Sequence, residues 1–134
     1  MGLSGSGEAR EIKILIVEDN ATFRQAFKEN LQLVGPDSII QEAVDAKECL
    51  EKVEAFRPHL IFMDIRVPGE SGLSLTKKIK ALYPAIQVIV MSSYDNLEYQ
   101  EAALQFGASR FLTKDTLTLA RIKPLILEDP LSHS

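Results

Sequence analysis

The stretch from Leu60 to Gly72 reads LIFMDIRVPGESG, and it decides the fold. Four apolar residues, enough for a short buried strand, run directly into Asp64, although a chain that leaves a buried strand usually meets glycine, asparagine or serine. A carboxylate at the edge of a core carries a desolvation cost. Asp64 therefore either hydrogen-bonds its own loop or is placed at this position to do chemistry.

The same kind of apolar run recurs along the chain, separated by segments with helical periodicity. Strands are predicted at 12–17, 38–42, 60–63, 87–91 and 110–112. Helices are predicted at about 20–34 with Asn20 as N-cap, 46–57, 71–83 with Leu75, Ile79 and Leu82 facing inward, and 99–106. A last helical pattern at 118–129 contains Pro124, which should end that helix early or kink it.

Regular alternation of strands and helices predicts a doubly wound α/β fold. Right-handed helical crossovers join parallel strands and place helices on both faces of the sheet. In this architecture ligands bind at the carboxyl ends of the strands. Polar residues that directly follow the apolar runs are therefore the candidate functional residues.

Four of the five predicted strands deliver polar residues to this edge. They are Glu18 and Asp19, Asp64, Ser92 and Ser93, and Lys114. Taken singly, each has a structural explanation, because acidic residues suit the first turn of a helix, serine precedes helices, and lysine is usually solvated. Taken together, three carboxylates and a lysine in one cleft predict a bound ligand.

The chemistry of these groups suggests what that ligand is. Neighbouring carboxylates raise one another's pKa unless a cation lies among them, and Mg²⁺ prefers oxygen ligands completed by phosphate. A lysine ammonium group would face the same phosphate as a point charge. A carboxylate such as Asp64 is a possible nucleophile for phosphoryl transfer.

Composition narrows the class of protein. The chain has 134 residues, the length of one domain, and 15 Lys and Arg against 19 Asp and Glu give a formal net charge of −4. No basic run is present, so we expect no direct binding of nucleic acid. One cysteine, Cys49, excludes an internal disulfide. With this single cysteine a reducing, cytoplasmic setting fits best. No apolar run is long enough to span a bilayer, so we expect a soluble protein that does not act at a membrane.

Four segments, in this order and with these separations, resemble the receiver domain of two-component response regulators. They are IVEDN at 16–20, MDIRVPGESG at 63–72, VIVMSS at 88–93 and GASRFLTKD at 107–115. The resemblance extends from Ile12 to about Ile122 and is closest in style to receivers of helix-turn-helix transcription regulators. It implies a flavodoxin-like fold, a five-stranded parallel sheet in the strand order 2-1-3-4-5 with helices on both faces.

The resemblance also implies a role for each candidate residue. Asp64 is the expected phosphoacceptor and Mg²⁺ the expected cofactor. The expected metal-binding groups are Glu18 (through water), Asp19 (directly), Asp64 and the backbone carbonyl of Arg66. The remaining expected roles are phosphate contact for Ser92 and Lys114, an aromatic switch for Phe111, and tuning of the acyl-phosphate lifetime for Arg66 and Tyr94.

The resemblance further implies a signalling switch, with no enzymatic action beyond self-phosphorylation and slow autodephosphorylation. A sensor histidine kinase or phosphotransfer protein would supply the phosphoryl group. An output domain or downstream protein would read it, and the phosphorylated form is a possible homodimer. We expect a disordered leader or cloning remnant at 1–11, the receiver domain at 12–127 and a linker stub or tail at 128–134, in a chain taken from a transcription regulator.

Three departures from the family pattern qualify these expectations. Asp115 follows Lys114 where many receivers have proline. Phe111 lacks the hydroxyl group of the more common tyrosine, so a switch here depends on packing alone. Receivers commonly use their last helix for dimerisation or output, so Pro124 within that helix leaves undecided which surface serves this purpose here.

Three other functions are compatible with parts of the sequence. An aspartate-nucleophile phosphatase would place a second acid two residues after the nucleophile, where this chain has Arg66. A flavodoxin-like cofactor binder would use serine, threonine and glycine in the first loop, where the acidic EDN would repel phosphate. A pseudo-receiver that acts only by binding other proteins is the alternative hardest to separate.

Overall fold

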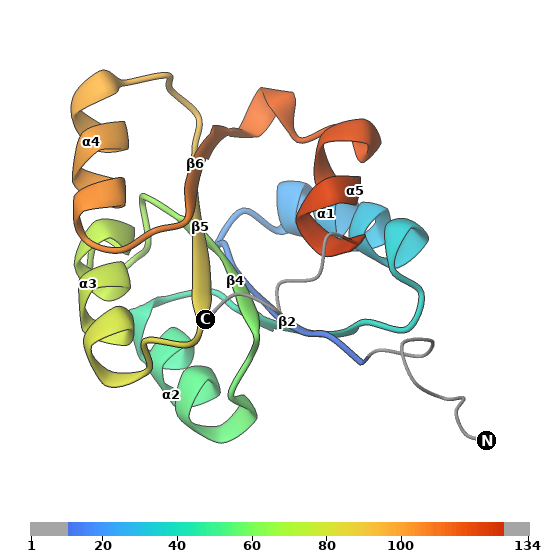
Figure 1. Cartoon of the computed structure of the whole chain (residues 1–134), viewed down its shortest axis with the longest axis horizontal. Coiled ribbons are helices and arrows are strands. Elements are labelled where there is room, and N and C mark those ends of the chain that lie inside the picture. Colours follow the sequence, from blue (N-terminus) through green and yellow to red (C-terminus); the bar gives the residue numbers. More distant parts are fainter. Residues whose placement is uncertain (1–10, 128–134) are drawn as a thin grey trace.

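Strands and helices alternate throughout residues 11–127, the part of the chain that the computed structural model describes (Figure 1). The strands are β2 (Lys13–Val17), β3 (Ile39–Ala43), β4 (Leu60–Asp64), β5 (Gln87–Ser92) and β6 (Arg110–Thr113). The helices are α1 (Ala21–Val34), α2 (Ala46–Phe56), α3 (Gly72–Leu82), α4 (Leu97–Gln105), the short 3₁₀ helix η1 (Lys114–Thr116) and α5 (Leu119–Leu127). The predicted leader, apart from Glu11, and the predicted tail lie outside the described residues.

The five strands form one parallel sheet in the order β3-β2-β4-β5-β6. Counted along the chain, this is the predicted 2-1-3-4-5 order, which is confirmed. Strand β2 ends at Val17 as predicted, and each of the other four strands extends one residue further toward its carboxyl end than predicted. The sheet register pairs Asp64 with Met91 and Ser92 with Thr113, so these two predicted site residues belong to the sheet itself.

Each face of the sheet is covered by its own layer of helices and its own core (Figure 1). Because successive residues of a strand point to opposite faces, Leu15 and Val17 face one core while Ile14 and Ile16 face the other. The first, here the α2–α4 core, also contains buried residues of α2, α3 and α4. The second, the α1–α5 core, contains those of α1 and α5. The continuous apolar runs of β2 and β4 follow from this two-sided burial.

Side-chain caps explain where four of the helices begin. Asn20, Asp45, Ser71 and Asn96 each accept a backbone hydrogen bond from the first turn of the helix that follows, at 2.8 to 3.0 Å. The predicted N-cap at Asn20 is confirmed. No helix among residues 11–127 combines the length and apolarity needed to cross a membrane.

The prediction that Leu82 faces inward is wrong, because its side chain is 70% exposed. Leu75 and Ile79 do lie in the α2–α4 core. Leu75 and Ile79 are four residues apart, and a further step of four leads to Tyr83. Tyr83 packs against that core and stands at the end of the helix. Leu82 lies three residues after Ile79 and turns toward solvent.

Of the two outcomes predicted for Pro124, an early end of the last helix or a kink in it, the early end is wrong. Helix α5 continues through Pro124 to Leu127, with Ile122 and Ile126 buried against the sheet. Pro124 removes the hydrogen bond to the carbonyl group of Ala120. Both residues are exposed, so water can take the place of the missing donor.

Candidate functional site

The carboxyl edge of the sheet gathers the polar residues that the sequence singled out. Glu18 and Asp19 follow β2, Asp64 ends β4, Ser92 ends β5, and Lys114 follows β6. Because all five strands are parallel, these positions lie along one edge. The side chains of Glu18, Asp19, Asp64 and Lys114 lie close together, as predicted.

Glu18, Asp19 and Asp64 form an acidic cluster. One carboxylate oxygen from each residue lies within 4.8 Å of the other two. Glu18 is only 1% exposed and Asp64 only 4%, whereas Asp19 is open to solvent. Carboxylates that are this close and this poorly hydrated repel one another unless a cation lies among them.

Lys114 supplies a cation to the acidic cluster. Its Nζ atom lies 2.6 Å from Glu18 Oε1 and 3.4 Å from Asp64 Oδ1. One ammonium group against three carboxylates leaves a net formal charge of −2 when all four groups are ionised. The lysine therefore only partly relieves the repulsion.

The oxygen atoms of Glu18 test whether a metal ion fits the cluster. Oε2 accepts a hydrogen bond from the backbone N–H of Asn20 at 3.0 Å. Oε1 is buried and, within residues 11–127, has no hydrogen-bond partner beyond its contact with the Lys114 ammonium group. Three carboxylates, two of them buried, with a single ammonium group among them fit a hard divalent cation with oxygen ligands. The acidic cluster can hold a metal ion.

The pKa of the Asp64 carboxyl group is raised above its usual value. Burial is the main cause, and the charge of Glu18 adds to it. Lys114 and a hydrogen bond from the backbone N–H of Arg66 act in the opposite direction. Asp64 is thus a carboxylate of increased basicity that its surroundings do not fully neutralise.

Gly72 allows the first turn of α3 to pack against the end of β4. A Cβ atom at this position would lie 2.0 Å from the carbonyl oxygen of Asp64. The N–H of Gly72 donates to the carbonyl of Ile65 at 2.9 Å, and the buried hydroxyl group of Thr76 donates to the carbonyl of Gly72 at 2.7 Å. Sequence reasoning did not assign Gly72 a role. Its signal was a helix-weakening glycine in a predicted first turn.

The remaining predicted residues surround the acidic cluster. Ser92 is fully buried, and its Oγ atom accepts a hydrogen bond from the backbone N–H of Tyr94 at 3.0 Å. Within residues 11–127 Ser92 makes no hydrogen bond with the acidic cluster. Phe111 is half-buried and packs against the α2–α4 core. The guanidinium group of Arg66 lies 5.4 Å from the ring centroid of Tyr94, and both residues are exposed.

Two residues of helix α1 contact the site without having been predicted to do so. The ring centroid of Phe23 lies 4.8 Å from Lys114 Nζ. Arg24 donates from Nη1 to the carbonyl of Glu18 at 2.8 Å and from Nε to Glu42 at 2.7 Å. Both follow the acidic pair by one helical turn, which is the only signal that the sequence held.

Comparisons with known proteins agree with this geometry. Residues 14–125 match the family model of the response regulator receiver domain. Transcriptional regulatory protein DegU of Brevibacillus brevis is 31% identical over 105 residues, which are 78% of this chain and 44% of that protein. Oxygen regulatory protein NreC of Staphylococcus haemolyticus is 32% identical over 105 residues, 78% of this chain and 48% of that protein. The chain thus spans less than half the length of these curated relatives.

Solved structures with similar folds point the same way. The signal receiver domain of the response regulator NarL from Mycobacterium tuberculosis superposes with a TM-score of 0.83 at 26% identity, covering 92% of this chain and 99% of that one. A CheY-like receiver domain protein from Methanospirillum hungatei gives a TM-score of 0.81 at 27% identity, covering 90% and 94%. With the family model matched over most of its length, this chain belongs to the response regulator receiver domain family of two-component signalling proteins.

Proposed function

We propose that Asp64 accepts a phosphoryl group from a sensor histidine kinase or a phosphotransfer protein, with Mg²⁺ as cofactor. The position of Asp64 carries this proposal. Its carboxylate stands at the carboxyl end of β4, within 4.8 Å of oxygen atoms of Glu18 and Asp19 and 3.4 Å from Lys114 Nζ. Membership of the receiver family supports the same assignment.

The transfer step is a displacement at phosphorus. A carboxylate oxygen of Asp64 forms the new bond to phosphorus while the bond between phosphorus and the donor's imidazole nitrogen breaks. The imidazole leaves with the electron pair of that bond. Asp64 has two carboxylate oxygens, so one can contact the metal ion or Lys114 while the other attacks phosphorus.

Glu18, Asp19, Asp64 and the backbone carbonyl of Arg66 would hold the Mg²⁺ ion. When bound, the ion supplies positive charge for the carboxylates and for the phosphoryl oxygens. Lys114 shares the Glu18 oxygen that this charge would neutralise. Its ammonium group is then free to turn toward the phosphoryl group.

Ser92 and Phe111 would convert phosphorylation into a change of conformation. The hydroxyl group of Ser92 donates to a phosphoryl oxygen, and the half-buried ring of Phe111 moves inward as Ser92 is drawn toward Asp64. Moving the population from nearly all inactive to nearly all active requires about 5.5 kcal/mol of differential stabilisation. The same site would catalyse its own phosphorylation from small donors and its slow hydrolysis.

Arg66 and Tyr94 would set the lifetime of the phosphorylated state. Their cation–π contact connects the segments that follow β4 and β5 beside Asp64. A water molecule that attacks the acyl phosphate must approach from solvent. Two large exposed side chains in contact can restrict that approach.

The kind of protein that contains this chain is proposed from the relatives. DegU and NreC are named as regulatory proteins, and the matched region covers less than half of each. We therefore place this chain in a transcriptional response regulator of the cytoplasm, where an output domain or a downstream protein reads the phosphorylated state. A phosphorylation-dependent homodimer is one way in which that state is read.

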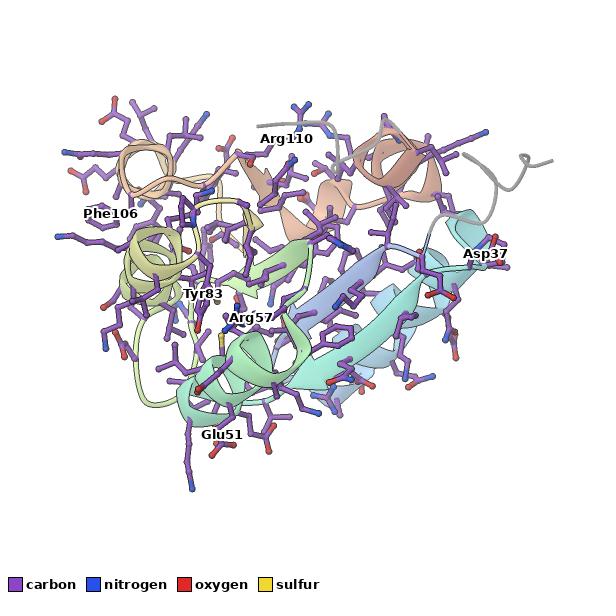
Figure 2. All side chains as sticks on the ribbon, turned by 60° about the horizontal axis from the view of Figure 1, so that its bottom comes forward. Asp37, Glu51, Arg57, Tyr83, Phe106 and Arg110 are labelled. Atoms are coloured by element: carbon purple, nitrogen blue, oxygen red, sulfur yellow. The ribbon has the colours of Figure 1, made fainter. Side chains whose placement is uncertain are left out.

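Acetyl phosphate provides the first test. The protein is incubated with acetyl phosphate and Mg²⁺, with and without EDTA, and its intact mass is measured. We expect one phosphoryl adduct that requires the metal and is absent from Asp64→Asn. Asp37→Asn is the matched control, because Asp37 lies exposed in the turn between α1 and β3 and should leave the adduct unchanged (Figure 2).

The opposite result would favour binding without phosphorylation. If folded wild-type protein, checked by circular dichroism, forms no adduct with Mg²⁺ present, the chain is a pseudo-receiver. An adduct that persists in Asp64→Asn would place the phosphoacceptor elsewhere.

A further inference from the structure

An aromatic ring contacts the ammonium group of Lys114 in addition to the acidic cluster. The ring centroid of Phe23 lies 4.8 Å from Lys114 Nζ, within the range of a cation–π interaction. Phe23 lies in the first turn of α1, where its backbone N–H donates to the Asn20 cap at 2.8 Å. The side chain of Lys114 is 16% exposed, so solvent screens this contact only partly.

A series of packed rings anchors Phe23 to the strand that carries Asp64. Phe23 stacks on Phe27 with a centroid distance of 5.7 Å, and Phe27 meets Phe62 edge-on at 4.8 Å. Phe62 is fully buried in β4, two residues before Asp64. Because packed rings cannot shift independently, the surface under Lys114 is held in a fixed position relative to Asp64.

The ring differs from the other two partners of Lys114 in how it holds the charge. Glu18 and Asp64 are anions that compete with any other anion for the ammonium group. The face of an aromatic ring attracts the cation but carries no net charge. Phe23 can therefore keep the ammonium group in place while leaving its full positive charge available.

We propose that Phe23 positions the Lys114 ammonium group beside Asp64 for contact with the incoming phosphoryl group. The inference rests on the proposed function, in which Lys114 contacts that group. Once the Glu18 oxygen is neutralised by the bound cation, the ring is the partner that keeps the lysine from turning into solvent. Phe23 is a positioning residue, because it acts through Lys114 and does not touch the reacting atoms.

The test compares Phe23→Leu with Phe23→Tyr. Leucine keeps the apolar contact with Phe27 but removes the aromatic face, whereas tyrosine keeps both. Phosphorylation of Asp64 is followed at several concentrations of acetyl phosphate with Mg²⁺, which separates the maximal rate from the half-saturating concentration. We expect Phe23→Leu to lower the maximal rate about fivefold and Phe23→Tyr to restore it to within about twofold of wild type.

Phe106→Leu is the matched control. Phe106 stands at the end of α4, and its ring centroid lies 5.3 Å from Nζ of Lys77 in α3 (Figure 2). This variant therefore removes a similar cation–π contact away from the acidic cluster. It should leave the maximal rate unchanged. Circular dichroism and thermal unfolding confirm that each variant is folded.

The NMR shifts of Lys114 report the contact directly. The ring current of Phe23 shifts the methylene protons next to Lys114 Nζ upfield, and this shift should disappear in Phe23→Leu and persist in Phe23→Tyr. A wild-type maximal rate in folded Phe23→Leu, or an equal loss in Phe23→Tyr, would overturn the inference alone. Absence of any Asp64 adduct in wild type would overturn the proposed function, and this inference with it.

Discussion

At the amino edge of the sheet, half-buried polar groups are paired in hydrogen bonds, whereas at the carboxyl edge buried carboxylates face one another. At the amino edge, Nδ1 of His59 accepts from the backbone N–H of Lys13 at 3.0 Å, and the N–H of His59 donates to the carbonyl of Lys13 at 2.8 Å. Nζ of Lys13 donates to the carbonyl of Phe56 at 2.9 Å. These contacts connect the starts of β2 and β4.

Like charges repel one another at the carboxyl edge but not among the contacts described at the amino edge. Glu18 and Asp64 are buried beside each other, and Lys114 neutralises them only in part. Such an arrangement lowers the stability of the isolated fold, and it is typical of sites that are completed by a ligand. The contrast supports the proposed function, in which the carboxyl edge binds a metal ion and a phosphoryl group while the amino edge is held by paired contacts.

The largest effect is expected from adding a methyl group behind the acidic cluster. Gly72→Ala would place Cβ 2.0 Å from the carbonyl oxygen of Asp64, and a backbone atom cannot move aside as a side chain can. We expect a loss of about 3 kcal/mol in the free energy of unfolding, measured with urea. Gly35→Ala is the control, because its Cβ would meet the movable side chain of Ser38, and it should cost clearly less. Equal losses would contradict the close approach at Gly72.

Removal of the Lys114 charge should destabilise the protein more than removal of an exposed lysine charge does. Lys114→Met leaves two buried carboxylates without their cation, so we expect a loss of about 2 kcal/mol in the free energy of unfolding without Mg²⁺. Mg²⁺ should recover part of this loss. Lys78→Met, which removes an exposed ion pair with Glu70, should cost less than about 0.5 kcal/mol. A Lys114 variant as stable as wild type would show that repulsion between Glu18 and Asp64 does not lower the stability of the fold.

Replacement of the nucleophile should stabilise the protein while abolishing its phosphorylation. Asp64→Asn removes a buried charge that lies beside Glu18 and whose carboxyl group has a raised pKa. We expect a gain of about 1 kcal/mol in the free energy of unfolding without divalent cation. The thermal shift caused by millimolar Mg²⁺ should shrink, because one ligand carries less charge. Asp37→Asn should change neither quantity, and a destabilised Asp64→Asn would argue that this charge supports the fold.

The smallest expected effect concerns pH at the amino edge. Burial, and then the charge of Lys13, lower the pKa of the His59 imidazole in the folded protein. The unfolded chain therefore binds the proton more tightly, and the stability contributed by His59 is present above its unfolded pKa and lost as the pH falls. His59→Asn keeps an acceptor for the N–H of Lys13 but does not titrate. Comparison of unfolding free energies at about pH 7.5 and about pH 5 should show a smaller decrease in the variant. An equal decrease would assign the pH dependence to other groups.

Much of the fold could be predicted, because its signals are local. The two periods of apolar residues mark where strands and helices lie, and caps such as Asn20 mark where helices begin. Two predictions about α3 and α5 failed, at Leu82 and Pro124, because a spacing rule does not say where a helix leaves the sheet or which of its sides faces water.

The candidate site divides in the same way. Glu18, Asp19, Asp64 and Lys114 could be identified because each directly follows or ends an apolar run, and parallel strands bring such positions to one edge. The roles assigned to Ser92, to Phe111 and to the backbone carbonyl of Arg66 stay predictions. Phe23 and Gly72 also border the site, but their only local signals were too weak to identify them: Phe23 follows the acidic pair by one helical turn, and Gly72 is a glycine in a predicted first turn.

The sequence by itself determined the order of the elements and the edge of the sheet at which the charged residues meet. Both follow from periodicity and from the parallel direction of the strands, which neighbouring residues encode. Only the tertiary structure decided that the ring of Phe23 lies against Lys114 and that the backbone of Gly72 passes the carbonyl of Asp64. Those contacts join residues that are distant along the chain or lie across a tight turn, and they depend on how closely the packed elements approach one another.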